Sequence, residues 1–348
     1  MKLKQSILNL TLNELQQWVA TAGEPAFRAT QIFDWIYDKR MYDFDGMTNL
    51  SIGFRKKLAS AFHVLDFSVS NRQESVDGSV KYAFRLQDDG IIETVHMPSD
   101  NYDTLCISSQ SGCALGCRFC ATAQLGIHRN LTVSEIISQV LHSHSDVNRR
   151  CNLVFMGMGE PLLNSENVFR SIDIMTGKWG LGWSSRRITL STCGIVPEIE
   201  RLVEKGLDVN LAISLNAADD KTRNRLMPIN RKYPLKLLMQ CLSDYVFKTR
   251  KTRVTFEYIM IKNINDSDET AKKLTKLLNK THSKINLIPL NPVKATRYNP
   301  SDSERILAFQ KILSDAGFLV RIRQSRGSDI LAACGQLAGD SLNKSEEI

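Results

Sequence analysis

The first 65 residues carry apolar side chains at three- and four-residue intervals, with polar residues between them. The segments LTLNELQQWV, AFRATQIFDWIYDKR and FRKKLASAF follow this pattern, and Gly23-Glu24-Pro25 interrupts it. Such spacing places the apolar residues along one face of an α-helix. We therefore predict a helical accessory domain over residues 1–65.

Residues 66–98 change to a period of two, with Tyr82, Phe84 and Leu86 on one face of a strand. Turn-forming pairs stand at Asp77-Gly78 and Asp89-Gly90. Alternation interrupted by Asp-Gly pairs is typical of antiparallel β-hairpins. This region is predicted to form a small β-hairpin extension that links the helical domain to the rest of the chain.

From residue 104 onward, short runs rich in β-branched residues alternate with helical stretches such as VSEIISQVLHSH and VPEIERLVEKG. Six β/α units in series indicate parallel strands, so residues 99–335 are expected to form an α/β core built as a partial (β/α)6 barrel, followed by a tail at 336–348. In such barrels the chemistry lies in the loops that follow the strands. The predicted strands are TLCIS, LVFMG, RITLS, VNLAISL, VTFEYIM and INLIPL, and a further run, LVRIRQS, comes after them.

The composition and the distribution of apolar residues bear on where in the cell the protein is expected to act. The chain has 348 residues and is 43% hydrophobic, enough to bury a substantial core. Its start does not resemble a signal peptide and no apolar run reaches the length of a membrane span, so a cytoplasmic protein with no membrane partner is expected. In a reducing compartment the eight cysteines are candidates for metal ligands, catalytic thiols or buried apolar residues rather than disulfides.

The net charge of +8 leaves two interpretations open. One is a polyanionic partner such as RNA, and the other is that basic side chains only solvate helix surfaces. The basic residues cluster at positions 186–187, 221–225, 231–232 and 248–253.

Three cysteines stand in one short loop after the first predicted strand. Cys113, Cys117 and Cys120 have the spacing C-x3-C-x2-C, which leaves a metal centre one ligand short. A [4Fe-4S] cluster held by three cysteines has one open iron, and this spacing is the fingerprint of the radical-SAM enzymes, in which that iron binds the methionine moiety of S-adenosylmethionine. The alternative is a structural zinc ion, with His128 as the fourth ligand.

The loop after the second strand, Gly157-Met158-Gly159-Glu160-Pro161, favours the first interpretation. Gly157 and Gly159 allow the backbone to approach a ligand closely, and Glu160 is able to accept a hydrogen bond from an ammonium group. Further polar residues follow the later strands, at Ser191-Thr192, Ser214-Leu215-Asn216 and Asn291-Pro292.

With these motifs in order along almost the whole chain, the sequence resembles the RlmN/Cfr family of radical-SAM RNA methyltransferases. The family transfers a methyl group to an sp2 carbon of adenosine, at C2 in the RlmN branch and at C8 in the Cfr branch. The matching segments are FRATQIFDWIY, MTNLS, IIETVHMP, TLCISSQSGCALGCRFCATAQLG, NLTVSEII, FMGMGEPLLN, RRITLSTCGIVP, LMPIN, NLIPLNP and ILAACGQLAGD.

The resemblance implies roles for two distant cysteines and a glutamate. A first S-adenosylmethionine methylates Cys334, and a second yields the 5′-deoxyadenosyl radical that removes hydrogen from this methyl group, so two are used per turnover. The carrier then adds to the adenine and joins protein to RNA. Cys106 resolves this adduct and leaves a Cys106–Cys334 disulfide, with Glu93 as the proton acceptor.

The resemblance also assigns the residues that bind S-adenosylmethionine. One departs from the family, because position 216 is Asn where relatives commonly have His. Cys151, Cys193 and Cys241 match no family role and are expected to be apolar fillers. The expected S-adenosylmethionine-binding residues are Gly159, Glu160, Ser191, Ser214, Leu215, Asn216 and Asn291.

The segments CALGC, LSTCGIVP and AACGQLAGD resemble the RlmN branch more than the Cfr branch. We therefore expect a monomer that methylates C2 of an adenosine in 23S ribosomal RNA and in transfer RNA, and takes electrons from a donor such as flavodoxin. Three alternatives stay open: a Cfr-like C8 methyltransferase, a zinc-stabilised RNA-binding protein without catalysis, and a radical-SAM enzyme that acts on a small molecule or a protein.

Overall fold

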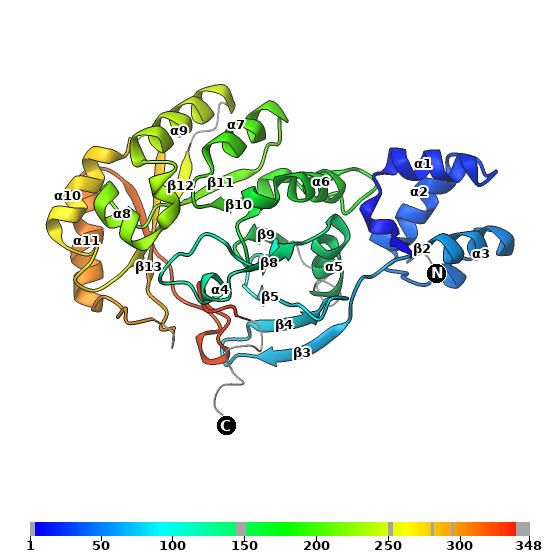
Figure 1. The fold of residues 1–348 in the computed structure, drawn as a ribbon, viewed down its shortest axis with the longest axis horizontal. Coiled ribbons are helices and arrows are strands. Elements are labelled where there is room, and N and C mark those ends of the chain that lie inside the picture. Colours follow the sequence, from blue (N-terminus) through cyan, green and yellow to red (C-terminus); the bar gives the residue numbers. More distant parts are fainter. Residues whose placement is uncertain (1–3, 144–150, 250–252, 280–281, 294–295, 339–348) are drawn as a thin grey trace.

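A single ten-stranded sheet organises the chain in the computed structural model, which describes residues 4–143, 151–249, 253–279, 282–293 and 296–338 (Figure 1). The strand order is β14-β13-β12-β11-β10-β9-β6-β5-β4-β3. The two ends of this order, β14 and β3, do not pair with each other, so among the described strands the barrel is open.

The parallel part of the sheet contains the six predicted β/α units and a seventh strand from the run LVRIRQS. Each strand pairs in parallel with the one before it, which confirms the expected α/β class. The strands are β6 (Asp103–Cys106), β9 (Cys151–Phe155), β10 (Ile188–Thr192), β11 (Asn210–Ser214), β12 (Val254–Met260), β13 (Ser283–Pro289) and β14 (Leu319–Ile322).

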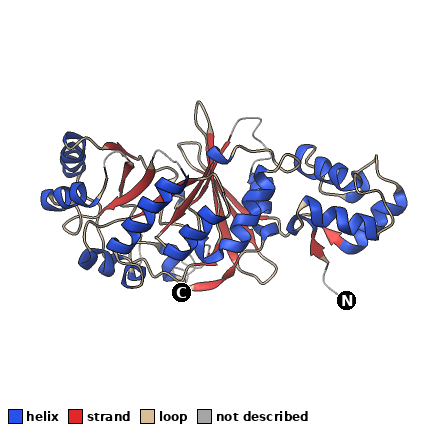
Figure 2. Cartoon of the chain, turned by 90° about the horizontal axis from the view of Figure 1, so that it is seen from above, coloured by secondary structure: helices blue, strands red, loops and turns tan. Residues whose placement is uncertain are grey.

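Helices between these strands cover the outer face of the sheet (Figure 2). Side-chain caps define several of their starts: Asp219 accepts a hydrogen bond from the Thr222 N–H and Ser267 from the Thr270 N–H. The helices are α5 (Val133–Ser143), α6 (Ser165–Thr176), α7 (Val196–Glu204), α8 (Asp220–Leu226), α9 (Leu235–Thr249), α10 (Asp268–Leu277) and α11 (Ser303–Asp315). The short helix α4 (Ala121–Gln124) follows Cys120 directly and is not one of them.

The predicted hairpins form three antiparallel strands that continue the main sheet: β3 (Val69–Glu74), β4 (Val80–Arg85) and β5 (Ile91–Met97). The last of them, β5, pairs antiparallel with β6, and this register places Val95 opposite Cys106. The hairpin region is therefore a part of the sheet that supports the first barrel strand, and Glu93 lies within it.

The N-terminal residues fold as the predicted helices: α1 (Leu12–Thr21), α2 (Arg28–Phe33), continued by a π-helix at Asp34–Asp38, and α3 (Ile52–Ala61). A capping box between Thr11 and Glu14 starts α1. The helical pattern did not predict the short parallel pair of β1 (Gln5–Ser6) and β2 (Phe62–His63) that closes this region. Its core also includes residues of α5 and α6, so the helical region packs onto the barrel.

No helix among the described residues is long and apolar enough to cross a bilayer.

Candidate active site

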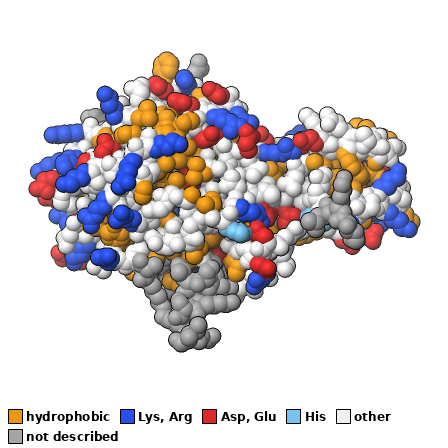
Figure 3. Space-filling view, viewed as in Figure 1, with side chains coloured by type: hydrophobic (Ala, Val, Ile, Leu, Met, Phe, Trp, Pro, Cys, Tyr) orange, Lys and Arg blue, Asp and Glu red, His pale blue; other side chains and the backbone are white. Residues whose placement is uncertain are grey.

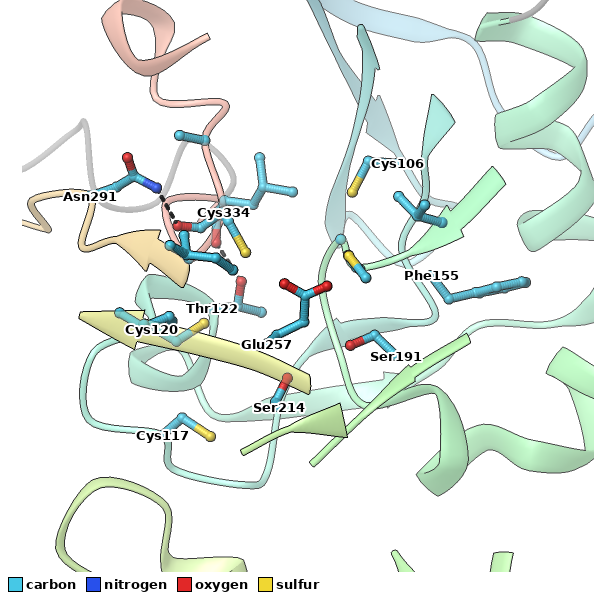
Figure 4. A pocket seen from close by; sticks show the side chains of 18 of the residues that line it. Cys106, Cys117, Cys120, Thr122, Phe155, Ser191, Ser214, Glu257, Asn291 and Cys334 are labelled. Carbon is cyan, nitrogen blue, oxygen red and sulfur yellow. Dashed lines mark hydrogen bonds between the residues drawn. The ribbon is translucent and has the colours of Figure 1, made fainter. Parts of the chain in front are cut away.

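A cavity of about 250 Å3 opens at the carboxyl ends of the parallel strands, and most of the predicted site residues line it (Figure 4). It brings together residues of β6, β9, β10, β11, β12 and β13 with the segment after β14, the cysteine loop and the C-terminal loop. The predicted residues in its wall are Cys106, Cys113, Cys117, Cys120, Gly159, Glu160, Ser191, Ser214, Asn216, Asn291 and Cys334.

A small separate hairpin holds the cysteine loop. Strand β7 (Gln110–Gly112) pairs antiparallel with β8 (Ile127–Asn130), and the Cys113 N–H donates to the Gly126 carbonyl at 2.7 Å. Helix α4 begins directly after Cys120, so the loop is anchored on both sides. Its three thiols consequently face the cavity together.

The donor set fits an iron-sulfur cluster better than a zinc ion. In the described part of the chain, no group of three His, Cys, Asp or Glu side chains is arranged to hold one metal ion. His128 does not line the cavity and instead contacts Asp88, with Nε2 3.2 Å from Oδ2. A cubane cluster spreads its thiolate ligands over separate irons, so they stand farther apart than around a single ion. Burial raises the pKa of Cys113 to about 12.

The glycines of the GMGEP loop are required by close packing against the protein's own chain, a different reason from the predicted approach of a ligand. A Cβ on Gly159, which has a φ of 98°, would lie 2.6 Å from the Gln110 Cβ. A Cβ on Gly157 would lie 2.7 Å from the Ile107 carbonyl carbon. Contacts this short exclude any side chain at either position. The loop after β9 is therefore pressed against the segment that leads into the cysteine loop.

Glu160 is buried in the cavity wall with both carboxylate oxygens already bonded to the protein. Oε1 accepts from the Leu162 N–H at 3.1 Å, and Oε2 accepts from the Cys193 N–H at 2.8 Å. Burial raises the pKa of Glu160, and these backbone donors oppose that effect. Each oxygen keeps a second lone pair, so the carboxylate is still able to accept from a ligand ammonium group.

The end of β11 contributes residues in two different ways. Ser214 lines the cavity, whereas Leu215 is fully buried and does not line it. Asn216 has a φ of 58°, and its Oδ1 accepts from the Ile259 N–H at 2.9 Å. This side chain holds the end of β11 against β12.

Cys334 lies in a C-terminal loop that closes one side of the cavity. The Asn291 Nδ2 donates to the Cys334 carbonyl at 3.0 Å, and the Ala121 N–H donates to the Gly335 carbonyl at 2.7 Å. The Thr122 hydroxyl donates to the Leu337 carbonyl at 2.5 Å. Asn291, predicted to bind S-adenosylmethionine, therefore also positions the Cys334 loop, which α4 ties to the cysteine loop.

The two distant cysteines, Cys106 and Cys334, both point into this cavity (Figure 4). Cys334 is the one exposed side chain among the eight cysteines, all of which are described. The cavity walls nevertheless desolvate it and, together with the charge of Glu257, raise the pKa of Cys334 to about 11. Burial likewise raises the pKa of Cys106 to about 12.

Glu93 does not line the cavity, although it lies on the same face of β5 as Val95 and Met97, which do. Its Oε1 is 3.2 Å from the Lys81 Nζ, and both side chains are buried. Its Oε2 accepts from the Ala338 N–H at 2.9 Å. The carboxylate therefore joins the hairpin region to the C-terminal segment, a contact that the strand pattern did not predict.

Arg223 and Cys193 are among the side chains in or near the cavity that were not predicted to belong to the site. Arg223 is fully buried and donates to three carbonyl oxygens, those of Cys193, Ser214 and Leu215. Cys193 has its Sγ 4.0 Å from the Cys117 Sγ, so this expected filler lies beside a predicted cluster ligand. Nothing in the local pattern around either residue distinguishes it from an exposed helix charge or a small apolar residue.

The basic clusters occupy different edges of the barrel. Positions 186–187 precede β10, and 248–253, of which 250–252 lie outside the described residues, precede β12, so both are at the amino ends of strands. The clusters at 221–225 and 231–232 follow β11 and belong to the cavity side, where Lys221, Arg225, Arg231 and Lys232 are exposed. Figure 3 shows Lys and Arg side chains over the part of the molecule where Figure 1 labels α8, α10 and α11.

Comparison with known proteins covers almost the whole chain. Residues 5–64 match the ribosomal RNA large subunit methyltransferase N-terminal domain, and residues 107–274 match the radical SAM superfamily. The chain is 46% identical over 352 aligned positions to the dual-specificity RNA methyltransferase RlmN of Desulfotalea psychrophila, covering 98% of this chain and 97% of that protein.

The fold agrees with a solved structure over a similar extent. A crystal structure of a radical SAM methyltransferase from Sphaerobacter thermophilus matches with a TM-score of 0.92 and 41% identity, covering 96% of this chain and 99% of that one. The superfamily implies a [4Fe-4S] cluster and S-adenosylmethionine, and the three thiols of the cysteine loop suit the cluster. The chain belongs to the RlmN family of radical SAM RNA methyltransferases.

Proposed function

We propose that this enzyme methylates C2 of an adenosine in 23S ribosomal RNA and in transfer RNA, with Cys334 as the methyl carrier and a covalent protein-RNA adduct as an intermediate. The observation that carries the proposal is the presence of Cys106 and Cys334 in one cavity with the three thiols of the cysteine loop. A methyltransferase that acted by direct transfer would have no use for two further cysteines there. The relative's description as dual-specificity supports two classes of RNA substrate.

Residues of the cavity wall hold the cofactors. Cys113, Cys117 and Cys120 ligate the cluster, and S-adenosylmethionine, two per turnover, supplies first a methyl group and then a radical that abstracts hydrogen. The proposed binding residues for S-adenosylmethionine are Gly159, Glu160, Ser191, Ser214, Leu215, Asn216 and Asn291. Of these, Leu215 stands behind the cavity wall, where its N–H donates to the Glu257 carbonyl and its own carbonyl accepts from Arg223.

Cys334 carries the methyl group because its thiol is the exposed one in the cavity. Once the carrier carbon has bonded to the adenine, the adduct radical would return one electron to the cluster and the base loses a proton. The Cys106 thiol then gives up its proton, and its sulfur attacks the Cys334 sulfur. The bond between the Cys334 sulfur and the carrier carbon breaks, its electron pair goes to that carbon, and the carbon takes up a proton. The products are methylated RNA and a Cys106–Cys334 disulfide.

Glu93 is the proposed acceptor for the proton lost by the base. In this structure its carboxylate is bonded to Lys81 and to the Ala338 N–H. To meet a base in the cavity it has to exchange the Ala338 contact for the substrate, which makes residues 336–338 part of the mechanism. Lys81 keeps its contact with the other carboxylate oxygen.

We assign the remaining parts of the chain to substrate and electron delivery. Residues 1–65 form an RNA-binding accessory domain, 66–98 a linking hairpin region and 99–335 the catalytic core. Residues 336–348 are the tail, of which 336–338 pack against the core and 339–348 lie outside the described residues. An electron donor such as flavodoxin reduces the cluster, and the enzyme acts as a cytoplasmic monomer.

Cysteine substitutions test the division of labour between the two thiols. Cys106→Ala leaves the carrier intact but removes the resolving thiol, so the purified protein should carry covalently bound RNA, seen as a nuclease-sensitive shift on a denaturing gel. Cys334→Ala should form no adduct and leave the RNA unmodified. Cys241→Ala is the matched control, because Cys241 is buried outside the cavity and should leave methylation unchanged.

Two results would contradict the proposal. If neither Cys106→Ala nor Cys334→Ala traps RNA and both are inactive, Cys106 does not resolve an adduct. If mapping of ribosomal RNA from cells with and without the enzyme places the new methyl group on C8, the Cfr-like activity replaces the proposed one.

A further inference from the structure

Glu257 is a buried carboxylate in the cavity wall to which the proposed function assigns no role. It lies in the middle of β12, in register with Ser214 of β11 and Asn286 of β13, so the three side chains share one face of the sheet. The residue is 6% exposed and lines the cavity. An ionisable group at such a position has a large desolvation cost and calls for an explanation.

Only one of its two oxygens is satisfied. Oε1 accepts from the Asn286 Nδ2 at 2.9 Å, whereas Oε2 is buried and has no hydrogen-bond partner in the described part of the chain. Burying an acceptor without a partner destabilises the fold, and native structures rarely retain such an atom without a use. The free oxygen is therefore available to a group that enters the cavity or to a side chain that reaches across it.

The charged and titratable groups around Glu257 come from three elements. Lys284 of β13 and Arg323, which follows β14, lower its pKa, but burial is the larger effect and raises it. The third group is Cys334 from the C-terminal loop, whose thiol pKa is raised by the charge of Glu257. Figure 4 shows the carboxylate extending from β12 into the space between the Cys334 loop and Cys106.

We propose that Glu257 is the general base that takes the thiol proton of Cys334 while Cys334 is methylated. This assignment rests on the proposed function, in which Cys334 is the methyl carrier. The Cys334 sulfur forms a bond to the methyl carbon, the bond between that carbon and the sulfonium sulfur breaks, and its electron pair stays on the sulfonium sulfur, which becomes a neutral thioether. The thiol proton passes to Oε2 of Glu257, so charge and atoms balance.

A base is needed because the thiol ionises poorly at this site. A thiol with a pKa of about 11 is ionised in only about 1 molecule in 10⁴ at neutral pH, and the neutral thiol is a weak nucleophile. A carboxylate whose pKa is raised toward neutrality is a better proton acceptor than an ordinary one. Glu160 and Glu93 are less suited, because each has both oxygens bonded to protein donors or to a lysine.

The test compares Glu257→Gln with the wild type and with Glu135→Gln. Glutamine keeps the size of the side chain and the hydrogen bond from Asn286, but it cannot accept the proton. Glu135 is another buried carboxylate, on α5 and away from the cavity, so its variant controls for the loss of a buried charge. Each holoenzyme, reconstituted anaerobically from protein purified without its cluster, receives S-adenosylmethionine with a deuterated methyl group.

The labelled fraction of Cys334 is followed by peptide mass spectrometry between pH 6 and pH 9. Glu257→Gln should slow labelling by about 10²–10⁴-fold at neutral pH, the range for loss of a general base, and its rate should rise with pH as the thiolate forms. Glu257→Asp, whose carboxylate is shorter by one methylene, should recover part of the rate. Glu135→Gln should label like the wild type, and iron content and the S-adenosylmethionine dissociation constant should be unchanged in Glu257→Gln.

A second measurement on Glu257→Gln, the rate of Cys334 alkylation, should change in the opposite direction from the rate of methylation. Loss of the negative charge beside Cys334 should lower the pKa of its thiol, so a simple alkylating agent should modify Cys334 faster in Glu257→Gln than in the wild type. Slower methylation together with faster alkylation is the signature of a missing base, because a disturbed loop would slow both reactions or neither.

The outcomes separate this assignment from the proposed function. Equal labelling of Cys334 in the wild type and in Glu257→Gln overturns the role of Glu257 alone. So does a defect that disappears at saturating S-adenosylmethionine, which would make Glu257 a binding residue. No label on Cys334 in the wild type overturns the methyl-carrier proposal itself, and the role of Glu257 with it.

Discussion

Arg223 shows how a single buried side chain organises the cavity wall. Its Nε and one terminal nitrogen donate to the carbonyls of Leu215 and Ser214 at the end of β11, and the same terminal nitrogen donates to the Cys193 carbonyl after β10. The other terminal nitrogen donates to the Asn230 Oδ1 at 2.8 Å. The planar guanidinium has several N–H donors that point in different directions and reach all of these acceptors, whereas a lysine ammonium group does not have this geometry.

Replacing Arg223 should therefore destabilise the fold. Arg223→Ala leaves several buried carbonyls without donors, each costing about 1–3 kcal/mol, so the free energy of unfolding should fall by about 3 kcal/mol or more. Chemical denaturation followed by circular dichroism measures this. Arg225→Ala, at an exposed position of the same helix, is the control and should change stability by less than about 0.5 kcal/mol. Equal stability of the two variants would show that the carbonyls find other partners.

At the scale of elements, the basic clusters lie at two opposite edges of the parallel sheet, depending on whether they precede or follow a strand. Loops that follow strands share an edge with the cavity, and segments that precede strands lie at the opposite edge. Arg187 at that opposite edge has its guanidinium 4.6 Å from the ring centroid of Tyr102, so part of its positive charge is engaged within the protein. Substrate RNA has to present its base to the cavity, which favours the clusters on α8 and after it.

Charge reversal should consequently weaken RNA binding more at α8 than at the opposite edge. The double variant Lys221→Glu, Arg225→Glu should lower RNA affinity and should reduce the magnitude of the slope of log affinity against log salt by about 1 for each phosphate that is no longer neutralised. Arg186→Glu should have a smaller effect on both. Fluorescence anisotropy with a labelled RNA hairpin over a range of salt concentrations measures both quantities. A larger effect of Arg186→Glu would place the RNA on the amino-end face.

At the scale of the whole molecule, the N-terminal helices and the barrel share an apolar interface. Val133, Ile137 and Leu141 of α5 and Ile174 of α6 belong to the N-terminal core, whereas Ile172 of α6 packs into the barrel core. Polar contacts border the interface: the Arg170 guanidinium donates to the Asn9 carbonyl at 2.6 Å, and the Ser134 N–H donates to the Asn9 Oδ1 at 2.9 Å. The accessory domain is therefore held against the barrel by packing as well as by the chain connection.

Two substitutions in one helix separate this interface from the barrel core. Ile174→Ala and Ile172→Ala should each cost about 2–5 kcal/mol, because both side chains are buried. Only Ile174→Ala should increase hydrogen exchange in α1 to α3 and lower RNA affinity while S-adenosylmethionine binding stays unchanged. Ile172→Ala should leave exchange in these helices as in the wild type. Similar exchange in both variants would mean that the helical domain does not depend on this contact.

Much of the architecture could be predicted from local sequence. Backbone conformation and the face that an element exposes depend mainly on residues close in sequence. For this reason the sequence predicted the helices in residues 1–65, the Asp-Gly turns of the hairpins and the six β/α units. The cysteine motif is equally local, because three ligands within one loop need no information about the rest of the fold. The sequence also predicted close approach of the backbone at Gly157 and Gly159, but to a ligand, whereas the structure places residues 107–110 of the chain itself against these glycines.

Which distant side chains meet depends on the three-dimensional fold. Resemblance, and not spacing, suggested that Cys106 and Cys334 act together, and the C-terminal loop had to fold over α4 to bring them into one cavity. Glu257 left a signal, a charge inside the apolar run VTFEYIM, but its free oxygen depends on the register of three strands. The sequence carried no signal for Arg223, because a charged residue in a polar helix is normally predicted to be exposed. The elements and the cluster loop could be predicted from the chain alone, since these depend on interactions between near neighbours, whereas the cavity arises from long-range packing that places strand ends and loops side by side.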